Sequence, residues 1–211
     1  MEKSKKEIIG VSGLARSGKN LFADVATDIL KQNGKTTKCW ALAYYLKQDC
    51  EEFIKKNLDL SVWSEKNEEK NVFRDLLVWY GDAKRKMSEG RFWIDQIQKD
   101  LNESTADVNI VTDIRYTTYP KDECYWIQKE MGGKLIHLAK YTFDKSGNKV
   151  FDLPPNKHEE HNDPILQKCS DFNIEWLSVR LKYNGSYIAM LADPYVREIV
   201  TNTLVGCGLI K

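Results

Sequence analysis

Residues 10–20 read Gly10-Val11-Ser12-Gly13-Leu14-Ala15-Arg16-Ser17-Gly18-Lys19-Asn20. This stretch joins an apolar strand, predicted over residues 7–12, to a helix predicted over residues 20–30 from the spacing of its apolar side chains. Gly13 and Gly18 bracket four residues, and Lys19 follows directly. That spacing is typical of a loop whose backbone N–H groups surround a phosphate chain while the lysine contacts its outer phosphates. The sequence therefore predicts a phosphate site between the first strand and the first helix.

The alternative is an ordinary glycine turn in front of a helix. Such a turn requires neither Lys19 directly after the second glycine nor Arg16 within the loop, so we favour phosphate binding. One position differs from the usual pattern, because Asn20 stands where a serine or threonine hydroxyl normally contacts Mg²⁺. An amide oxygen is a weaker ligand, and we expect the ion to be held through water and by the nucleotide itself.

Composition narrows the class of protein. The 211 residues suit one α/β domain spanning residues 1–211. Lys and Arg number 32 against 31 Asp and Glu, so a nucleic-acid partner is not expected. Five scattered cysteines indicate reduced thiols. The start of the chain lacks the apolar stretch of a signal peptide, and no apolar run could span a bilayer. We expect a cytoplasmic protein, in the host cytoplasm if viral, with no membrane partner; a homodimer is left open.

Strands and helices are predicted to alternate along the chain. Further strands are expected at residues 36–42, 107–113, 134–138 and 171–176. Helices are expected at residues 44–58, 65–87 with an interruption near Gly81, 92–101, 120–131 and 186–204. This alternation predicts a five-stranded, mostly parallel sheet with helices on both faces. Residues 141–163 are polar and contain Pro154 and Pro155, which indicates a long, lid-like loop leading into a short helix.

The central strand at residues 107–113 ends in a carboxylate, Asp113, and Arg115 follows closely. Ligands of parallel sheets lie at the carboxyl ends of the strands, so both side chains are expected beside the glycine-rich loop. Phosphoryl transfer requires cations at several such positions. The candidates are Arg16, Lys19, Lys47, Arg85 and Arg115. For Lys47 and Arg85, an ordinary surface charge is the alternative.

Four phrases occur in an order that resembles phage deoxynucleoside monophosphate kinases. They are Gly13-Leu14-Ala15-Arg16-Ser17-Gly18-Lys19-Asn20, Ala41-Leu42-Ala43-Tyr44-Tyr45-Leu46-Lys47, Tyr80-Gly81-Asp82-Ala83-Lys84-Arg85 with Phe92-Trp93, and Val111-Thr112-Asp113-Ile114-Arg115. Animal phosphomevalonate kinases look similar over the same segments. The resemblance implies a P-loop kinase three-layer sandwich, with an acceptor-binding helical region at about residues 43–105 and a lid at about residues 142–170.

The resemblance also implies roles for individual residues. ATP and Mg²⁺ would be held by Gly13, Arg16, Ser17, Gly18, Lys19, Asn20 and Leu21, with Asn20 and Asp113 nearest the metal. The acceptor would be bound by Lys47, Trp79, Arg85, Trp93, Asp113 and Arg115. Lys19, Arg16, Arg115, Asp113 and Arg85 would act in catalysis.

This chain departs from the family in two places. After the central strand it has Arg115-Tyr116-Thr117-Thr118-Tyr119-Pro120, where relatives usually have Arg-Phe-Pro-Asn-Glu. It has His158-Glu159-Glu160-His161 where relatives carry a His and a Ser-Glu phrase, and it lacks lid arginines. His158, His161 and Cys169 show incomplete zinc spacing. Trp40, Trp79 and Trp93 are candidates for stacking on a base.

The resulting expectation is an ATP-dependent, Mg²⁺-requiring kinase that converts a deoxynucleoside 5′-monophosphate to the diphosphate. Two alternatives are kept. The first is a phosphomevalonate-kinase-like enzyme, whose acceptor pocket would lack aromatic side chains that stack on a base. The second is a nucleotide-binding regulator without catalysis, which Asn20 suggests.

Overall fold

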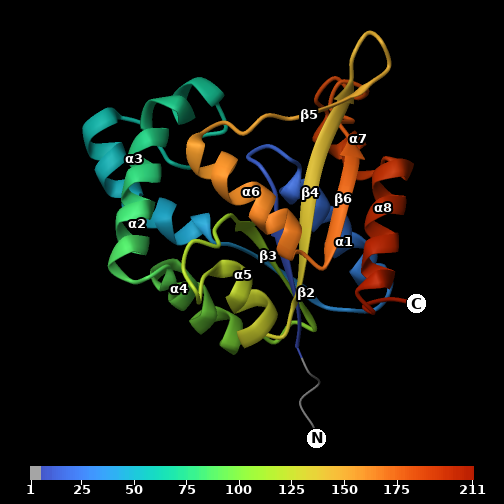
Figure 1. Ribbon diagram of the computed structural model, residues 1–211, viewed down its shortest axis with the longest axis horizontal. Helices are drawn as coiled ribbons and strands as arrows, with labels where there is room; N and C mark the ends of the chain where they lie inside the picture. The colour runs from blue at the N-terminus through green and yellow to red at the C-terminus, as the bar shows by residue number, and fades with distance from the viewer. Residues whose placement is uncertain (1–5) are drawn as a thin grey trace, which may run out of the picture.

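Strand β1 (Glu7–Ser12) lies in the middle of the sheet, and its last five residues are all buried. The computed structural model describes residues 6–211, and Figure 1 shows how the elements are arranged. β1 pairs in parallel with β3 (Val108–Ile114) on one side and with β4 (Lys134–Phe143) on the other. A strand between two parallel neighbours is covered on both faces, which explains why β1 is a continuous apolar run instead of an alternating one.

Five strands are parallel, in the order β2-β3-β1-β4-β6, with β2 (Thr37–Ala41) and β6 (Phe172–Leu177) at the edges. The sixth strand, β5 (Lys149–Phe151), pairs antiparallel with the far end of β4 and makes the sheet mixed. The α/β class and the five parallel strands are confirmed. The predicted long loop beginning at Tyr141 is wrong, because the end of β4 and all of β5 form a hairpin. β5 is exposed at every position, so it lacks the buried face that makes a strand recognisable in sequence.

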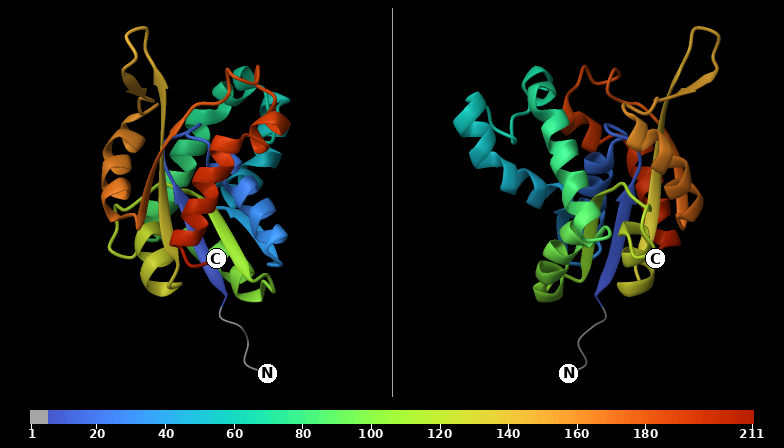
Figure 2. Two further views of the ribbon diagram at one scale, coloured as in Figure 1. Left: turned by 90° about the vertical axis from the view of Figure 1, so that its right-hand side faces the viewer. Right: turned by 60° about the vertical axis from the view of Figure 1, so that its left-hand side comes forward.

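Helices cover both faces of the sheet (Figure 2). One face is covered by α1 (Lys19–Gln32), α7 (Tyr187–Leu191) and α8 (Pro194–Gly206). The other face is covered by α4 (Arg91–Glu103), the short α5 (Glu123–Tyr125), the π-helical turn η1 (Trp126–Glu130) and α6 (Lys157–Cys169). Each helical layer buries apolar side chains against β1, β3 and β4, so the molecule has two cores separated by the sheet.

Helices α2 (Ala43–Leu58) and α3 (Asn67–Met87) form an arm at one side of the sheet (Figure 1). The arm has a small apolar core of its own, which includes Ile54 and Phe73. The predicted interruption near Gly81 is wrong, because α3 is continuous. A Cβ at Gly81 would lie only 3.2 Å from Leu46 Cδ2. This glycine therefore serves the close packing of α2 on α3 and does not end a helix.

Two predicted helices are interrupted by capping residues. Residues 120–131 form a turn, α5 and η1 in place of one helix, because the Asp122 side chain accepts the Glu123 N–H and starts the helix later. Residues 186–204 form α7 and α8, which are separated at Asp193. Asp193 caps α8 by accepting the Val196 N–H at 3.0 Å, and Pro194 occupies the first helical position.

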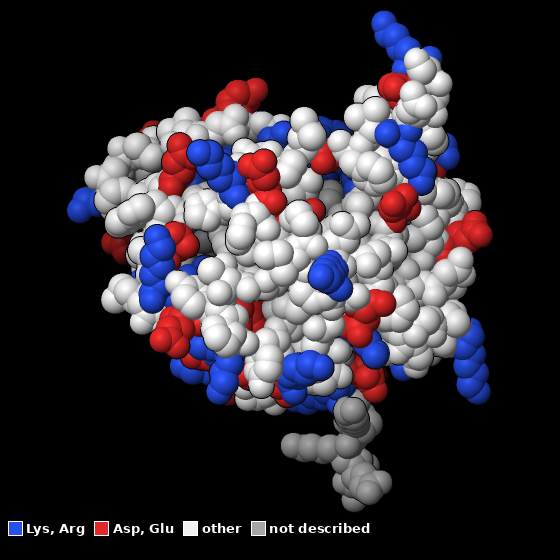
Figure 3. All heavy atoms as spheres, viewed as in Figure 1, with Lys and Arg blue, Asp and Glu red and all other residues white. Residues whose placement is uncertain are grey.

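The surface carries both signs of charge. On the face shown in Figure 3, acidic and basic side chains are interspersed. None of the helices formed by residues 6–211 combines the length and the apolar composition that crossing a bilayer requires.

Replacing Asp193 tests the junction between α7 and α8. Asp193 is fully buried, and its second oxygen accepts hydrogen bonds from Lys182 Nζ and the Tyr183 hydroxyl, both at 2.7 Å. We expect Asp193→Ala to lower the free energy of unfolding by about 2 kcal/mol or more, because it removes the cap, leaves the buried Val196 N–H without its acceptor and takes away the partner of Lys182 and Tyr183. Asp193→Asn keeps an acceptor for the cap and should lose less. Chemical denaturation measures both variants, and equal losses would contradict the capping explanation.

Candidate functional site

The glycine loop (residues 13–19) connects β1 to α1, as predicted. Gly13 and Gly18 have φ angles of 126° and 97°, which favour glycine. A Cβ at Gly13 would lie 2.4 Å from the Leu138 carbonyl oxygen, and one at Gly18 would lie 2.4 Å from the Trp176 ring. Both glycines are therefore required by backbone conformation and by close neighbours, and the loop packs against the middle of β4 and the end of β6.

Lys19 bends back over the loop that precedes it. Its ammonium donates to the carbonyl oxygens of Gly13 and Leu14 at 3.0 and 2.9 Å. The side chain is only 5% exposed. Burial, together with the neighbouring charge of Arg115, lowers the pKa of Lys19 to about 8, although Asp113 at 4.0 Å opposes the shift. The ammonium is poorly solvated, so an additional anion in front of the loop would stabilise its charged form.

Two more side chains bind the outer carbonyl groups of the glycine loop. Lys140 Nζ donates to the Arg16 carbonyl oxygen at 2.6 Å, and Trp176 Nε1 donates to the Ser17 carbonyl oxygen at 2.8 Å. With the carbonyl groups occupied, the N–H groups of Arg16 and Gly18 have no acceptor within the described part of the chain. The Ser17 N–H between them donates to the Leu14 carbonyl oxygen at 3.1 Å. Free N–H groups at the start of a helix form an anion-binding concavity.

Asp113 and Arg115 lie beside this concavity at the end of β3. The parallel pairing of β3 with β1 brings Ile114 opposite Ser12, one residue before the glycine loop. Arg115 Nη2 lies 3.1 Å from Asp113 Oδ1. Burial alone would raise the pKa of Asp113, but Arg115 and Lys19 more than offset it and hold the pKa below its usual value. Asp113 is therefore a carboxylate at neutral pH.

Glu159 was missed as a site residue. It comes from the first turn of α6, and its Oε2 accepts the Ala15 N–H of the glycine loop at 2.6 Å. Its Oε1 accepts from Arg115 Nη1 at 2.9 Å. The sequence holds one local signal, because Asn156 followed three residues later by Glu159 is a helix-capping pattern. That pattern predicts the start of α6 but not its contact with a loop 144 residues away.

A cleft of about 710 Å³ opens in front of the glycine loop. Its walls come from that loop, the α2–α3 arm, the segment after β3 and the segment after β6. Most of the predicted residues line it, namely Arg16, Ser17, Gly18, Lys19, Asn20, Leu21, Lys47, Arg85, Trp93, Asp113 and Arg115. The structure thus brings together side chains from strand ends and helices that are far apart in sequence.

Two predicted stacking residues lie outside the cleft. Trp79 is 67% exposed, because it lies on the face of α3 opposite Leu77 and Gly81, which line the cleft. Trp40 donates its Nε1 hydrogen to Asn109, which lies near the start of β3, whereas Asp113 and Arg115 of the cleft lie at the end of that strand. Neither side chain is placed to stack on a ligand in the cleft. Trp93 lines the cleft, as does Tyr116, which the sequence analysis did not select.

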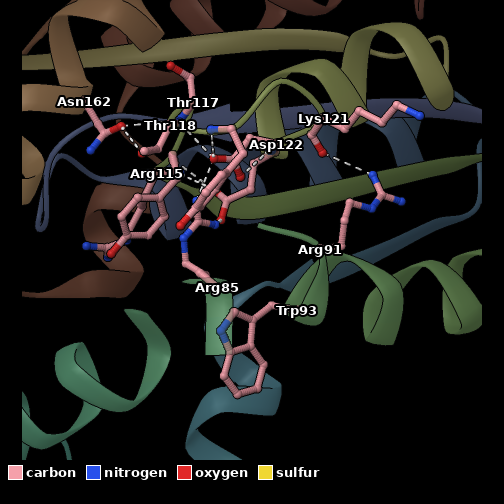
Figure 4. Close-up of polar contacts among 12 residues, drawn as sticks. Arg85, Arg91, Trp93, Arg115, Thr117, Thr118, Lys121, Asp122 and Asn162 are labelled. Carbon is pink, nitrogen blue, oxygen red and sulfur yellow. Dashed lines mark hydrogen bonds and ion pairs between the residues drawn. The ribbon is translucent and has the colours of Figure 1, made fainter. Parts of the chain in front are cut away.

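Arg85 is positioned differently from the expected phosphate clamp (Figure 4). It is 2% exposed, and its guanidinium pairs with Asp122 at 2.6 Å and with Glu123 at 2.9 Å. The Tyr116 ring covers it, with the ring centroid 3.8 Å from the guanidinium carbon. Two carboxylates therefore already bind its guanidinium, and this position favours a structural role over the predicted phosphate clamp.

The same carboxylates shape the segment after β3. Glu123 Oε2 accepts the N–H groups of Arg115 and Tyr116 at 2.6 and 2.9 Å. Asp122 Oδ2 accepts those of Thr118 and Tyr119 at 2.9 and 3.2 Å. Burial raises the pKa of Glu123 to about 7, although Arg85 favours its charged form. The backbone of Arg115 is thereby fixed by a buried network to which Arg85 contributes the positive charge.

Further cations line the cleft without having been predicted. Lys70 and Arg74 lie one turn apart on α3, and Arg180 follows β6. In the region from residue 6 to residue 211, none of the three has a carboxylate within ion-pair distance. Burial lowers the pKa of Lys47, the charge of Asp113 opposes this shift, and the nearby positive charges of Lys70 and Arg115 add to it. The arm side of the cleft thus carries uncompensated positive charge. One sequence signal was present, since lysine and arginine four residues apart occupy one helix face.

The residues expected near Mg²⁺ present suitable oxygen atoms. Asn20 is exposed in the first turn of α1 and lines the cleft, as does Asp113. Carboxylate and amide oxygens are ligands that Mg²⁺ accepts directly or through water. Among the described residues, no group of three or more His, Cys, Asp or Glu side chains is arranged to hold a metal ion, and His158, His161 and Cys169 do not form one.

No family model and no curated protein matches the sequence. Among solved structures, the chain is similar to the crystal structure of APE1195, with a TM-score of 0.37 and 10% sequence identity, over 95% of this chain and 98% of that chain. What the cleft can bind and catalyse is therefore inferred from its own residues and distances.

Replacing Arg85 by lysine separates a structural role from ligand binding. A single ammonium cannot serve Asp122 and Glu123 in the bidentate geometry of the guanidinium, so one buried carboxylate is left poorly paired. We expect Arg85→Lys to lower the free energy of unfolding by about 3 kcal/mol, as for other broken buried ion pairs. Arg74→Lys, on the same helix but without a carboxylate partner, is the control and should change little. Chemical denaturation decides, and equal stability of the two variants would contradict the structural role.

Proposed function

We propose that the protein is a P-loop kinase that uses ATP and Mg²⁺ to phosphorylate a deoxynucleoside 5′-monophosphate to the diphosphate. The observation that carries the proposal is the arrangement of the cleft. An anion-binding loop closes one end, and a helical arm with uncompensated cations faces it. A transfer between two phosphate-bearing substrates needs such a pair of anion sites on either side of the reacting group. The four sequence phrases shared with phage deoxynucleoside monophosphate kinases support the choice of substrate.

The donor half is assigned to the glycine loop and the segment after β6. The N–H groups of Arg16 and Gly18, which have no acceptor among the described residues, would donate to the triphosphate. Lys19 exchanges the carbonyl oxygens of Gly13 and Leu14 for phosphate oxygens when the donor binds. Val179 and Arg180 line the same end of the cleft and lie where the nucleoside of the donor would extend.

The acceptor half is assigned to the α2–α3 arm. Lys47, Lys70 and Arg74 supply the charge that a 5′-phosphate requires. Phe73, Trp93 and Tyr116 line this half. Phe73 and Trp93 are 2% and 4% exposed, so the half-buried Tyr116 provides most of the aromatic surface that faces a ligand. Aromatic walls favour a nucleobase over the aliphatic chain of a phosphomevalonate-like acceptor, so this feature supports the nucleotide kinase over that alternative.

The chemistry follows from positioning and charge. The acceptor phosphate attacks the terminal phosphorus of the donor in line with the leaving oxygen, and negative charge spreads over the transferred group. Lys19 and Arg115 flank that position and stabilise the developing charge. Mg²⁺, when bound with the donor, would neutralise phosphate charge, held through oxygens of Asn20 and Asp113. Asp113 accepts one hydrogen bond from Arg115 and retains lone pairs for a metal-bound water.

The regulator alternative rests on Asn20 and predicts nucleotide binding without turnover. A coupled assay for ADP release separates the two functions. Its substrates are the four deoxynucleoside monophosphates, their ribose counterparts and phosphomevalonate, each with and without Mg²⁺. Release of ADP with a deoxynucleoside monophosphate supports the proposal, and binding of ATP without release for any acceptor contradicts it.

Lys19→Ala tests the donor site. We expect kcat to fall by about 100-fold, or about 2.7 kcal/mol, because the lysine charge is lost where the transferred group becomes more negative. Lys31→Ala, in the last turn of the same helix and exposed, is the matched control and should keep wild-type turnover. A thermal melt checks that both variants are folded. Turnover of Lys19→Ala close to wild type would remove the glycine loop from the donor site.

The lowered pKa of Lys19 predicts a linkage between proton and ATP binding. Near pH 8 about half of the ligand-free protein lacks the Lys19 proton, and the triphosphate favours the charged form, so binding should take up about half a proton. Above that pH, the affinity should fall as the pH rises. Calorimetry in buffers of different ionisation enthalpy measures the uptake. It should persist in Lys31→Met and disappear in Lys19→Met, and a binding enthalpy independent of the buffer would contradict the linkage.

A further inference from the structure

Glu159 connects the glycine loop to the segment after β3. One carboxylate oxygen accepts the Ala15 N–H at 2.6 Å, and the other accepts from Arg115 Nη1 at 2.9 Å. The Glu159 side chain is 11% exposed, so water competes little for these contacts. Ala15 belongs to the loop after β1 and Arg115 to the segment after β3. A single side chain from a third element therefore fixes their separation.

The helix that carries Glu159 is itself bound to the sheet side of the site. Asn162 is buried and accepts from the Thr117 N–H at 3.3 Å and the Thr118 hydroxyl at 3.4 Å (Figure 4). One residue further on, Asp163 pairs with the buried His137 at 3.0 Å. Contacts on two successive residues hold α6 to the segment after β3 and to β4. Glu159 is thus presented from an anchored helix, although its segment was expected to be a lid.

The carboxylates of Asp113 and Glu159, which bind Arg115, determine how its guanidinium is oriented. Asp113 binds Nη2 and Glu159 binds Nη1, so the plane of the group is fixed from both sides. A guanidinium has five N–H donors, and these two contacts leave three for a ligand. Without Glu159, Arg115 would keep its charge but could rotate about the contact with Asp113. It would also lose a nearby carboxylate that offsets the repulsion between Arg115 and Lys19.

We propose that Glu159 is a positioning residue that holds Arg115 at a fixed distance from the glycine loop and so aligns the transferred phosphoryl group. The proposal rests on the kinase function proposed above. Glu159 does not contact the substrates and acts through Arg115 and Ala15. The bond between donor oxygen and phosphorus breaks, and the bond to the acceptor oxygen forms, while Glu159 stays ionised throughout.

The test compares Glu159→Gln with Glu160→Gln. Glu160 is the next residue of α6 and is exposed, so its variant has the same charge change without the bridge. Glu159→Gln should lower kcat by about 10-fold to 100-fold, the scale expected when a reacting group is misplaced by a fraction of an ångström to an ångström. The Kd for ATP without acceptor should stay within about threefold, because Lys140 and Trp176 hold the loop independently of Glu159. Glu160→Gln should match the wild type in both measurements.

A second variant and a second measurement keep the test decisive. Glu159→Asp retains the charge but is too short to reach both partners, so it should lose turnover as Glu159→Gln does, even if the latter folds poorly. The amide proton of Ala15, observed by NMR, should shift in both Glu159 variants and not in Glu160→Gln.

The outcomes are distinguishable. Wild-type protein that turns over no acceptor contradicts the proposed kinase function, whereas the Ala15 signal still reports on the bridge. Unchanged kcat in folded Glu159→Gln or Glu159→Asp overturns the positioning role. A higher kcat in either variant also overturns it, because it would mean that the carboxylate competes with phosphate. An Ala15 signal that does not move in the Glu159 variants shows that the bridge does not form.

Discussion

The direction of the glycine loop backbone is the constraint on which the site depends. Lys140 and Trp176 bind the carbonyl oxygens of Arg16 and Ser17, and the positive φ angles at Gly13 and Gly18 allow the chain to follow. A trans peptide group has its N–H opposite its C=O, so the bond from Trp176 to the Ser17 carbonyl directs the N–H of Gly18 to the opposite side. The free N–H of Gly18 is therefore a consequence of a contact made behind it.

Buried carboxylates organise the opposite side of the cleft. Asp122 and Glu123 accept four backbone N–H groups of the segment after β3, and Arg85 supplies the charge that lets both remain buried. Removing charges from water is costly, so such groups occur in native structures with their hydrogen bonds and charges matched. Arg85 is 2% exposed within this network, whereas the side chain of Arg115, which also binds two carboxylates, is 31% exposed and is the more accessible of the two to a phosphate.

Charge is balanced at the centre of the cleft and unbalanced at its arm. Lys19 and Arg115 lie among Asp113 and Glu159, whereas Lys47, Lys70 and Arg74 form no ion pair with any carboxylate within residues 6–211. Uncompensated cations attract an anionic ligand, and a balanced centre limits how strongly the ground state is held. Our assignment of donor, acceptor and positioning residue follows this division of charge.

The sequence by itself determined the local elements of this protein. The glycine spacing, the apolar run of β1 and the helix after it predicted the strand, loop and helix, because each is a property of neighbouring residues. The end of β3 was also correct, and with it the placement of Asp113 and Arg115 beside the loop, since parallel strands align their carboxyl ends. Most predicted site residues line the cleft for this reason.

Only the tertiary structure decided which partner each charge has. Arg85 and Arg115 look alike in sequence, yet one is bound to Asp122 and Glu123 and the other lies between Asp113 and Glu159. Likewise, Trp79 on α3 is exposed, whereas Trp93 on α4 is buried beside the cleft. The contact of Glu159 with Ala15 spans 144 residues. Such pairings depend on how whole helices and strands pack. A local pattern of residue types contains no information about contacts between residues so far apart in sequence.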